Sequence, residues 1–259
     1  MKRRIFIGRC PLDSISLTDL LPYLQQLVKN GGQHYVCFLE ANGFIHANND
    51  LEYRQLLTSA TLVLPDGIST IIGARICGES IQDRLTASIV LLEYCKYSTM
   101  KGNVRHFFYG GNVGVADKMV ETLKRQIPNI KIAGTYCPPF RPLTNDEDLH
   151  VKQIIEESKA DVVWVGLGAP KQEQWMAEHI GKINVPLFLG IGVTFDYFAN
   201  TRKRAPALIR EIGFEWLYRI LTGGRRILFR NIKCVPLMFQ FLVKTAVLRL
   251  CMRIKNKLK

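Results

Sequence analysis

The chain of 259 residues is 47% hydrophobic, which is enough to bury the core of one sizeable domain and leave an appendage. Its seven cysteines form no CxxC pair, and its five histidines show no metal-ligand spacing. These counts favour a reduced, cytosolic protein and argue against a disulfide scaffold or a structural zinc site.

The formal net charge of +13 lies entirely in the last 58 residues. Residues 202–259 contain 15 lysines and arginines against two acidic residues, whereas residues 1–201 contain 20 basic and 20 acidic residues. A cationic tail on a neutral body predicts an anionic partner, because its like charges otherwise repel one another. The candidates are a phosphate-rich ligand, a nucleic acid and an acidic membrane surface.

Short apolar runs alternate with longer amphipathic segments along the body. Strands are predicted over Tyr35–Leu39, Thr61–Leu64, His106–Tyr109, Lys131–Thr135, Val162–Leu167 and Pro186–Gly190. Helices are predicted over Leu17–Lys29, Leu51–Ser59, Ile68–Cys77, Ala87–Met100, Val113–Gln126, Asp146–Ser158 and Lys171–Ile180. This alternation indicates an α/β fold: a Rossmann-like, mostly parallel sheet flanked by helices, with ligands bound at the carboxyl ends of the strands. Composition changes near Thr201, which predicts an α/β domain of residues 1–200 and a basic amphipathic appendage of residues 201–259.

The predicted strand His106–Tyr109 runs into Gly110 and Gly111 before a helix. Paired glycines let the backbone approach a phosphate, whose charge the free N–H groups of a helix N-terminus bind. Glycines also form ordinary tight turns, so this segment alone does not decide between a phosphate site and a turn.

A second glycine-rich turn follows the strand Val162–Leu167. Gly168 is followed by Lys171 and Gln172 at the start of a helix, which gathers polar donors where a pyrophosphate or a sugar hydroxyl can bind. The alternative is a solvated first turn, in which Glu173 serves only as a capping carboxylate.

Two aspartates also follow predicted strands. Asp66 can cap the next helix, or its carboxylate can point into the strand-end crevice where a general base is needed; local chemistry alone favours the cap. Asp196 follows the turn Gly190–Gly192 and can bind a ribose or cap the next segment.

Residues 234–252 are rich in apolar side chains, but Lys244 and Arg249 interrupt them. A membrane-spanning helix needs about 20 apolar residues, and a charge near its centre costs about 3 kcal/mol. At helical period, one face collects Phe239, Leu242, Val243, Ala246, Val247 and Leu250. This pattern favours a helix lying on a membrane surface over a spanning helix, and the alternative is a helix packed on the domain.

Several short sequences occur in order along the chain: Leu64-Pro65-Asp66-Gly67, Tyr109-Gly110-Gly111, Gly134-Thr135-Tyr136, Gly166 to Trp175, Phe195-Asp196, Arg204-Ala205-Pro206 and Glu215-Trp216-Leu217-Tyr218-Arg219. Each alone is unspecific. The ordered set, which spans about Asn42 to Arg230, resembles the WecG/TagA/CpsF family of bacterial glycosyltransferases.

The resemblance implies transfer of a hexose or N-acetylhexosamine from a UDP-sugar to an undecaprenyl-diphosphate-linked sugar, with inversion. It places the protein peripherally on the cytoplasmic face of the bacterial inner membrane, and it implies no essential metal and no cofactor. Asp66 becomes the general base, which takes the proton of the acceptor hydroxyl. The acidic run Asp146-Glu147-Asp148 looks like a metal motif but is better interpreted as the first turn of a helix.

The leaving diphosphate of such a reaction must be neutralised by amides or cations. The expected substrate-binding residues at the strand ends are Gly110, Gly111, Gly168, Lys171, Gln172 and Asp196. The tail is expected to fold over the site and to supply Arg219, Arg225, Arg226 and Arg230. The alternative role of these arginines is to hold anionic lipid.

Three positions depart from the family pattern, one of which is Val193, where the family tends to have a glycine. The family usually has a small hydroxyl residue two positions before the asparagine that is Asn42 here, and this chain has Glu40. We expect both side chains in the sugar pocket, where a carboxylate would repel a uronic acid and can bind the hydroxyls of a neutral sugar. Asn200 replaces a usual glycine and, since Asn tolerates left-handed backbone, is expected to keep the turn.

Two other functions fit parts of the sequence. A nucleotide-binding oxidoreductase would explain the glycine turns, but an early GxGxxG followed by an acidic residue about 20 positions later is missing. A nucleic-acid-binding tail would use Phe229, Phe239 and Phe241 for stacking, but the apolar helical stripe suits lipid better. We therefore expect an anionic membrane surface to bind residues 202–259, with no nucleic acid, and we leave a homo-oligomer open.

Overall fold

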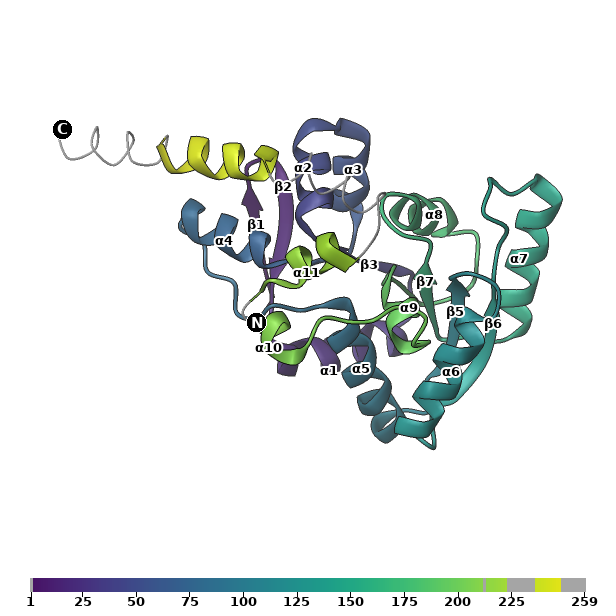
Figure 1. Cartoon of the computed structure of the whole chain (residues 1–259). Coiled ribbons are helices and arrows are strands. Elements are labelled where there is room, and N and C mark those ends of the chain that lie inside the picture. The colour runs from purple at the N-terminus through teal and green to yellow at the C-terminus, as the bar shows by residue number, and fades with distance from the viewer. Residues whose placement is uncertain (1, 212, 223–235, 248–259) are drawn as a thin grey trace.

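The computed structural model describes residues 2–211, 213–222 and 236–247. Its main sheet has six parallel strands in the order β4-β3-β8-β7-β5-β6, and a separate antiparallel hairpin joins β1 to β2 (Figure 1). The strands are β1 (Arg3–Ile7), β2 (Cys10–Ser14), β3 (His34–Leu39), β4 (Leu62–Pro65), β5 (Arg105–Gly110), β6 (Lys131–Tyr136), β7 (Val162–Gly166) and β8 (Leu187–Gly190). The helices are α1 (Leu17–Lys29), α2 (Ala41–Asn49), α3 (Leu51–Ser59), α4 (Ile68–Cys77), α5 (Ala87–Lys101), α6 (Val115–Gln126), α7 (Asn145–Glu157), α8 (Lys171–His179), α9 (Thr194–Phe198), α10 (Ala207–Glu211) and α11 (Glu215–Thr222).

The α/β fold with a parallel sheet is confirmed, and each of the six predicted strands is present within two residues at either end. The hairpin β1–β2 and helix α2 were not predicted. The β2 sequence CPLDS contains a proline and an aspartate, and α2 contains three asparagines and a glycine, which are poor helix formers. Tertiary packing therefore determines both elements.

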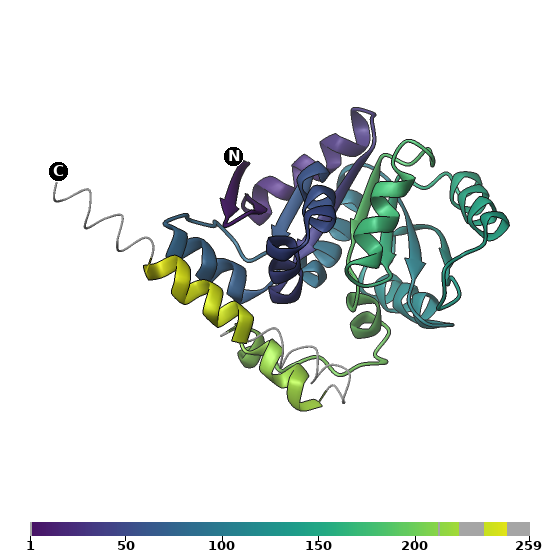
Figure 2. The ribbon, with the colours of Figure 1, turned by 90° about the horizontal axis from the view of Figure 1, so that it is seen from above.

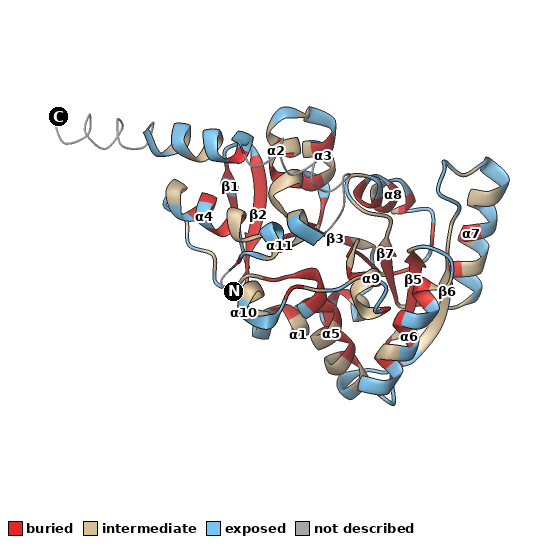
Figure 3. Ribbon diagram, in the orientation of Figure 1, coloured by how far each residue is buried: buried red, intermediate tan, exposed pale blue. Residues whose placement is uncertain are grey.

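Helices cover both faces of the sheet. Val162 and Trp164 of β7 face a core under α1, α5, α6 and α9, whereas Val163 and Val165 face a core under α2, α3, α7 and α8 (Figures 1 and 3). Because successive side chains of a strand point to opposite faces, a sheet covered on both sides requires continuous apolar runs. These runs are the signal that made the strands predictable.

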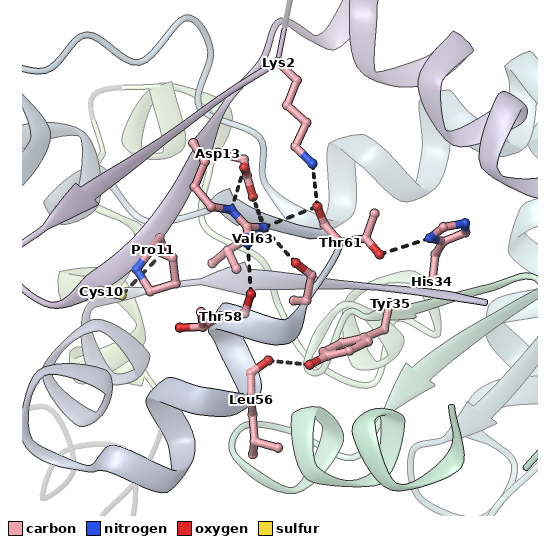
Figure 4. Close-up of polar contacts among 12 residues, drawn as sticks. Lys2, Cys10, Pro11, Asp13, His34, Tyr35, Leu56, Thr58, Thr61 and Val63 are labelled. Atoms are coloured by element: carbon pink, nitrogen blue, oxygen red, sulfur yellow. Dashed lines mark hydrogen bonds and ion pairs between the residues drawn. The ribbon is translucent and has the colours of Figure 1, made fainter. Parts of the chain in front are cut away.

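An ion pair buried on one side fastens the β1–β2 hairpin to β4. The Asp13 side chain is fully buried and accepts two hydrogen bonds from Arg4, at 2.8 and 3.0 Å, and one of 2.7 Å from the Val63 backbone N–H. Figure 4 shows Asp13 beside Val63, with Thr61 and Thr58 close by. Arg4 also donates to the carbonyls of Thr58 and Thr61, so the hairpin covers the outer strand of the sheet.

A helix over residues 236–247 packs against the body next to α4 (Figure 2). The rings of Phe241 and Phe44 of α2 lie 5.0 Å apart, edge to face, and Met238 is buried. The opposite side leaves Phe239, Val243 and Val247 about half or more exposed. The alternative of a helix packed on the domain therefore applies to one face, and membrane contact stays a prediction for the exposed face.

Leu242, which we expected on the free apolar face, instead packs against the core on the α2 side. Leu242 follows Phe239 by three residues, which is a rotation of about 300° around the helix axis. Its side chain therefore points about 60° away from that of Phe239, toward the body. Leu250 lies outside the described residues. Across the ranges that the structure describes, no helix has the length and apolar character needed to cross a membrane.

Candidate active site

The carboxyl ends of the parallel strands bring most of the predicted site residues to one edge of the sheet. Asp66 follows β4, Glu40 and Asn42 follow β3, and the glycine turns follow β8, β7 and β5. Adjacent strands lie about 4.8 Å apart, so the end of β4 and the end of β5 are about 19 Å from each other. A ligand that reaches Asp66 from the glycine turns must therefore extend along the edge of the sheet.

Asp66 and Glu40 lie in two turns that are hydrogen-bonded to each other. The backbone N–H groups of Asp66 and Gly67 both donate to the Leu39 carbonyl, at 3.1 and 3.4 Å. A Cβ atom on Gly67 would lie 3.4 Å from the Glu40 Cα. The Asn42 amide donates to a Glu40 carboxylate oxygen at 3.3 Å, and the turn that holds Asp66 lies next to this pair.

The structure places Asp66 just before the N-cap position of α4. The residue that caps α4 is Gly67, which has no side chain. The role of Asp66 as a base stays a prediction, because it depends on where a substrate binds.

The glycines at the ends of β5 and β7 pack too tightly for side chains. The Gly111 N–H donates to the Gly166 carbonyl at 3.1 Å, and a Cβ on Gly110 would lie 2.6 Å from the Gly166 carbonyl carbon. A Cβ on Gly166 would lie 2.5 Å from the Phe195 ring. Gly168 has a φ of +77° and nothing within 4 Å of its Cβ position, so only its backbone conformation requires glycine.

Gln172 holds two of these turns together from inside. Its side-chain oxygen accepts the Gly168 N–H at 3.1 Å, and its amide nitrogen donates to the Gly190 carbonyl and to Glu173, each at 3.0 Å. The side chain is buried, unlike the solvent-facing donor that the sequence suggested. Its effect on a ligand would therefore pass through the position of the turns.

Glu173 lies fully buried beneath these turns, so the alternative interpretation, a solvated first turn in which Glu173 is only a capping carboxylate, is wrong for this residue. Desolvation raises the pKa of Glu173 to about 7; its hydrogen bond from Gln172 opposes this shift, and the nearby charge of Glu40 adds to it. Its second carboxylate oxygen has no hydrogen-bond partner among the described residues. The sequence lacked a signal for this burial, because Glu173 sits among polar residues.

Lys171 and Asp196 lie at the margins of the site. The Lys171 ammonium is 5.0 Å from the centre of the Phe140 ring, on an exposed surface. Asp196 accepts a hydrogen bond from the Thr201 hydroxyl at 3.2 Å, and its carbonyl accepts the Thr201 N–H, so it does hold the following segment. Asn200 has a φ of +55°, as expected for a replacement of glycine.

The tail arginines are described only in part. Arg219 belongs to α11, whereas Arg225, Arg226 and Arg230 lie outside the described residues. Their proposed part in neutralising a diphosphate stays a prediction.

The acidic run at 146–148 forms the first turn of α7, as predicted. Thr144 and Glu147 make a capping box, and Asp148 pairs with His179 at 2.9 Å and with Lys152 at 2.6 Å. Over the described part of the chain, no three His, Cys, Asp or Glu side chains are grouped as a metal site.

Three further arginines near Asp66 had no predicted role. Leu85 donates its N–H to the Pro65 carbonyl at 3.0 Å, which places Arg84 beside the end of β4. Arg204 and Arg210, from the start of the appendage, line a cavity together with Arg84. The motif Arg204-Ala205-Pro206 could have singled out Arg204, but only the folded chain brings these residues together.

Comparison with known proteins gives consistent matches. The model of the glycosyl transferase WecG/TagA/CpsF family matches residues 5–250. An N-acetylglucosaminyldiphosphoundecaprenol N-acetyl-beta-D-mannosaminyltransferase from Bacillus spizizenii is 30% identical over 222 residues, which cover 85% of this chain and 83% of the relative. Proteins of the same name are 32% identical over 180 residues in Bacillus subtilis (70% and 68% covered) and 25% identical over 234 residues in Staphylococcus aureus (90% and 89% covered).

Proposed function

The chain belongs to the WecG/TagA/CpsF family of glycosyl transferases, and from that premise we propose that it moves a sugar from a UDP-sugar to a polyprenyl-diphosphate-linked sugar, with inversion. Membership makes the chain a glycosyltransferase and sets aside the oxidoreductase alternative. The relatives are named for transfer of N-acetylmannosamine to N-acetylglucosaminyldiphosphoundecaprenol, which supports this class of acceptor.

The main observation behind the proposal is that Asp66 and the glycine turns lie at the same edge of the sheet, where the parallel strands end. A carboxylate at the end of β4, polar side chains at the end of β3 and close-packed glycines at the ends of β8, β7 and β5 follow one another along the sheet. This order suits an extended nucleotide sugar, with its diphosphate over the glycines and its sugar toward Glu40 and Asn42.

In the proposed reaction, Asp66 accepts the proton of an acceptor hydroxyl while that oxygen attacks the anomeric carbon. The new bond forms on the face opposite UDP, and the bond from the anomeric carbon to the diphosphate oxygen breaks, so UDP leaves with the electron pair. Backbone N–H groups of the glycine turns stabilise the departing charge together with the appendage arginines Arg219, Arg225, Arg226 and Arg230. Gln172 keeps the Gly168 and Gly190 turns in place.

Glu40 and Asn42 are the proposed contacts to the donor sugar. Their hydrogen bond of 3.3 Å presents a carboxylate and an amide together, next to the Asp66 turn. A carboxylate accepts hydrogen bonds from neutral hydroxyl or acetamido groups and repels a uronic acid. We therefore propose a neutral donor, of which UDP-N-acetylmannosamine has the support of the relatives' names.

The proposed location is the anionic surface of the cytoplasmic face of the bacterial inner membrane. The helix at 236–247 exposes Phe239, Val243 and Val247, and residues 202–259 carry the whole net charge of the chain. Apolar insertion and attraction to anionic headgroups together support peripheral binding.

The test is UDP release from a panel of UDP-sugars, with and without a polyprenyl-diphosphate-N-acetylglucosamine acceptor, in the presence of EDTA and anionic vesicles. The panel contains N-acetylmannosamine, N-acetylglucosamine, glucose, galactose and the corresponding uronic acids as UDP derivatives. We expect acceptor-dependent release from one neutral donor, with a β-linked product confirmed by NMR. No release from any donor, or release only from a uronic acid, would contradict the proposal.

A further inference from the structure

A cavity of about 170 Å³ lies between the body and the start of the appendage. The body contributes the segment before α5 and the first turn of that helix, and the appendage contributes α10 and the residues beside it. We call it the arginine pocket; it is lined by Arg84, Thr86, Ile89, Arg204, Ala207, Arg210, Glu211 and Glu215.

The arginine pocket adjoins the Asp66 turn on two sides. The Leu85 N–H bond to the Pro65 carbonyl places the body side of the pocket next to the end of β4. On the other side, the loop between α10 and α11 covers the start of α4, since a Cβ on Gly213 would lie 2.7 Å from Ile68. Figure 2 shows α10 and α11 on the same side of the body as helix 236–247.

The cationic groups of the pocket are incompletely paired. In the described part of the chain, the buried Nε atoms of Arg204 and Arg210 have no hydrogen-bond partner. The nearest carboxylate to Arg204 is Glu215, at 3.9 Å, and the Arg204 side chain is only 26% exposed. Three guanidinium groups and two carboxylates leave one net positive charge in the cavity.

Desolvation lowers the pKa of Arg204; the charge of Arg210 adds to this shift, while Glu215 and Asp66 oppose it. An anion in the pocket would offset the repulsion between Arg204 and Arg210 and would supply acceptors for the two Nε–H groups.

The position of the pocket indicates which substrate it serves. The glycine turns that suit the donor diphosphate begin two strands away from β4, on the side of Asp66 that faces the middle of the sheet. The arginine pocket adjoins the end of β4, the edge strand, through the hydrogen bond from the Leu85 N–H to the Pro65 carbonyl. It reaches α9 through the contact of Arg204 with the Tyr197 ring at 5.5 Å. A base that links donor and acceptor stands between them, so the two diphosphates belong on opposite sides of Asp66.

We propose that the arginine pocket binds the diphosphate of the lipid-linked acceptor, through Arg204 and Arg210 and beside the first turn of α5. This inference rests on the proposed function for the identity of the acceptor, and on the geometry for the binding of a diphosphate at this place. The first turn of α5 contributes a favourable helix terminus for phosphate. Arg84 holds the wall in place, since its guanidinium donates to the Arg210 carbonyl at 2.6 Å.

The first experiment measures binding of farnesyl diphosphate to the full chain by isothermal titration, together with inorganic pyrophosphate and UDP. Arg210→Gln removes one guanidinium and keeps the backbone carbonyl that Arg84 uses. We expect at least a tenfold loss of affinity for farnesyl diphosphate and a change of less than twofold for UDP. Lys101→Gln, which removes one exposed charge at the opposite end of α5, is the matched control and should change neither.

The second experiment compares steady-state kinetics of the same variants. We expect Arg210→Gln to raise the KM for the acceptor at least tenfold while the KM for the donor stays within twofold of wild type. Arg204→Gln should have the same effect, and it carries the test if Arg210→Gln has a lower melting temperature than wild type. Pelleting with phosphatidylglycerol vesicles should be unchanged in both.

The outcomes separate the sources of phosphate and the two proposals. Weaker binding of UDP rather than farnesyl diphosphate would assign the pocket to the donor, and loss of vesicle binding alone would assign it to a lipid headgroup; either result overturns the inference. So does a wild-type chain that does not bind farnesyl diphosphate. Arginine-dependent binding of farnesyl diphosphate without transfer from any donor would support the pocket and contradict the proposed function.

Discussion

The body and the described part of the appendage differ in how far they bury their large apolar side chains. In the body, Trp164, Tyr94 and Phe44 are among the large side chains that are completely buried, whereas Leu208, Leu221 and Phe239 of the appendage are 69–77% exposed. Burial of apolar surface stabilises by about 25 cal/mol per Å². The body obtains this stabilisation from its own residues, and the appendage leaves a surface on which an external partner can obtain it.

The charges show the same contrast. Asp13 is paired with Arg4 and Asp161 with Arg105, both within the body. The appendage has 15 basic residues and only Glu211 and Glu215 to balance them. Internal complementarity therefore contributes to the stability of the body, while the excess of positive charge in the appendage predicts contact with anions. The division at about residue 200 stays a prediction, since parts of the appendage also pack on the body.

The chemistry is expected to belong to the body, so the largest change should come from Asp66. We expect Asp66→Asn to lower kcat about 10³-fold, because a general base contributes roughly 10² to 10⁴ in rate. Binding of the UDP-sugar should stay within twofold of wild type, since the substitution keeps the shape of the side chain. Turnover near the wild-type rate would show that Asp66 is not the general base. The base would then have to come from another part of the chain, such as the appendage.

Internal pairing in the body can be broken at Asp13. We expect Asp13→Ala to lower the free energy of unfolding by about 4 kcal/mol, because it leaves Arg4 and the Val63 N–H without their buried acceptor. Glu79→Ala is the matched control: Glu79 pairs with Arg3 of the same hairpin, but on the exposed surface, and should cost less than about 1 kcal/mol. Denaturation in urea measures both, and equal effects would contradict the assignment of stability to buried pairing.

The buried carboxyl group of Glu173 has an oxygen without a hydrogen-bond partner among the described residues. Its titration should therefore change the free energy of unfolding with pH. The pKa of Glu173 is about 7 in the folded chain, compared with 4.5 for an ordinary glutamate. The folded state therefore holds its proton more tightly than the unfolded state, so the contribution of Glu173 is complete below pH 4.5 and is lost as the pH rises through 7.

We accordingly expect Glu173→Gln to raise the free energy of unfolding by about 3 kcal/mol at pH 8 and by less than about 1 kcal/mol at pH 5. The glutamine keeps an acceptor for Gln172. Glu178→Gln, on the exposed side of the same helix, should show no pH-dependent difference. Urea denaturation at the two pH values is the measurement, and an equal effect of Glu173→Gln at both would show that burial does not shift this group.

Helix 236–247 has one face packed on the body and one face exposed, so both kinds of apolar side chain can be tested on a single helix. Phe239→Ser combined with Val243→Ser should reduce pelleting with phosphatidylglycerol vesicles about tenfold without lowering the melting temperature, because both side chains are exposed. Phe241→Ser, on the packed face, should instead cost about 2 kcal/mol of stability through loss of its contact with Phe44. Unchanged pelleting of the double variant would exclude this face as the membrane contact.

Local patterns in the sequence were enough to predict the strands, most of the helices and the chemistry at their ends. Apolar runs and helical periodicity depend on neighbouring residues, so the positions of Asp66, Gly110 and Gly168 after strands could be read directly. The charge division at residue 202 is likewise a property of composition. These features also carried the resemblance to the family that the matches confirmed.

The tertiary structure alone decided which strand ends are neighbours and which polar groups are buried. The order β4-β3-β8-β7-β5-β6 puts Glu40 next to Asp66, although 26 residues separate them in the chain. Burial of Glu173 and assembly of the arginine pocket depend on contacts between residues more than 100 positions apart, for example between Arg84 and Arg210. A local pattern specifies an element but not its partner, because pairing free energy is gained only when distant segments exclude water together.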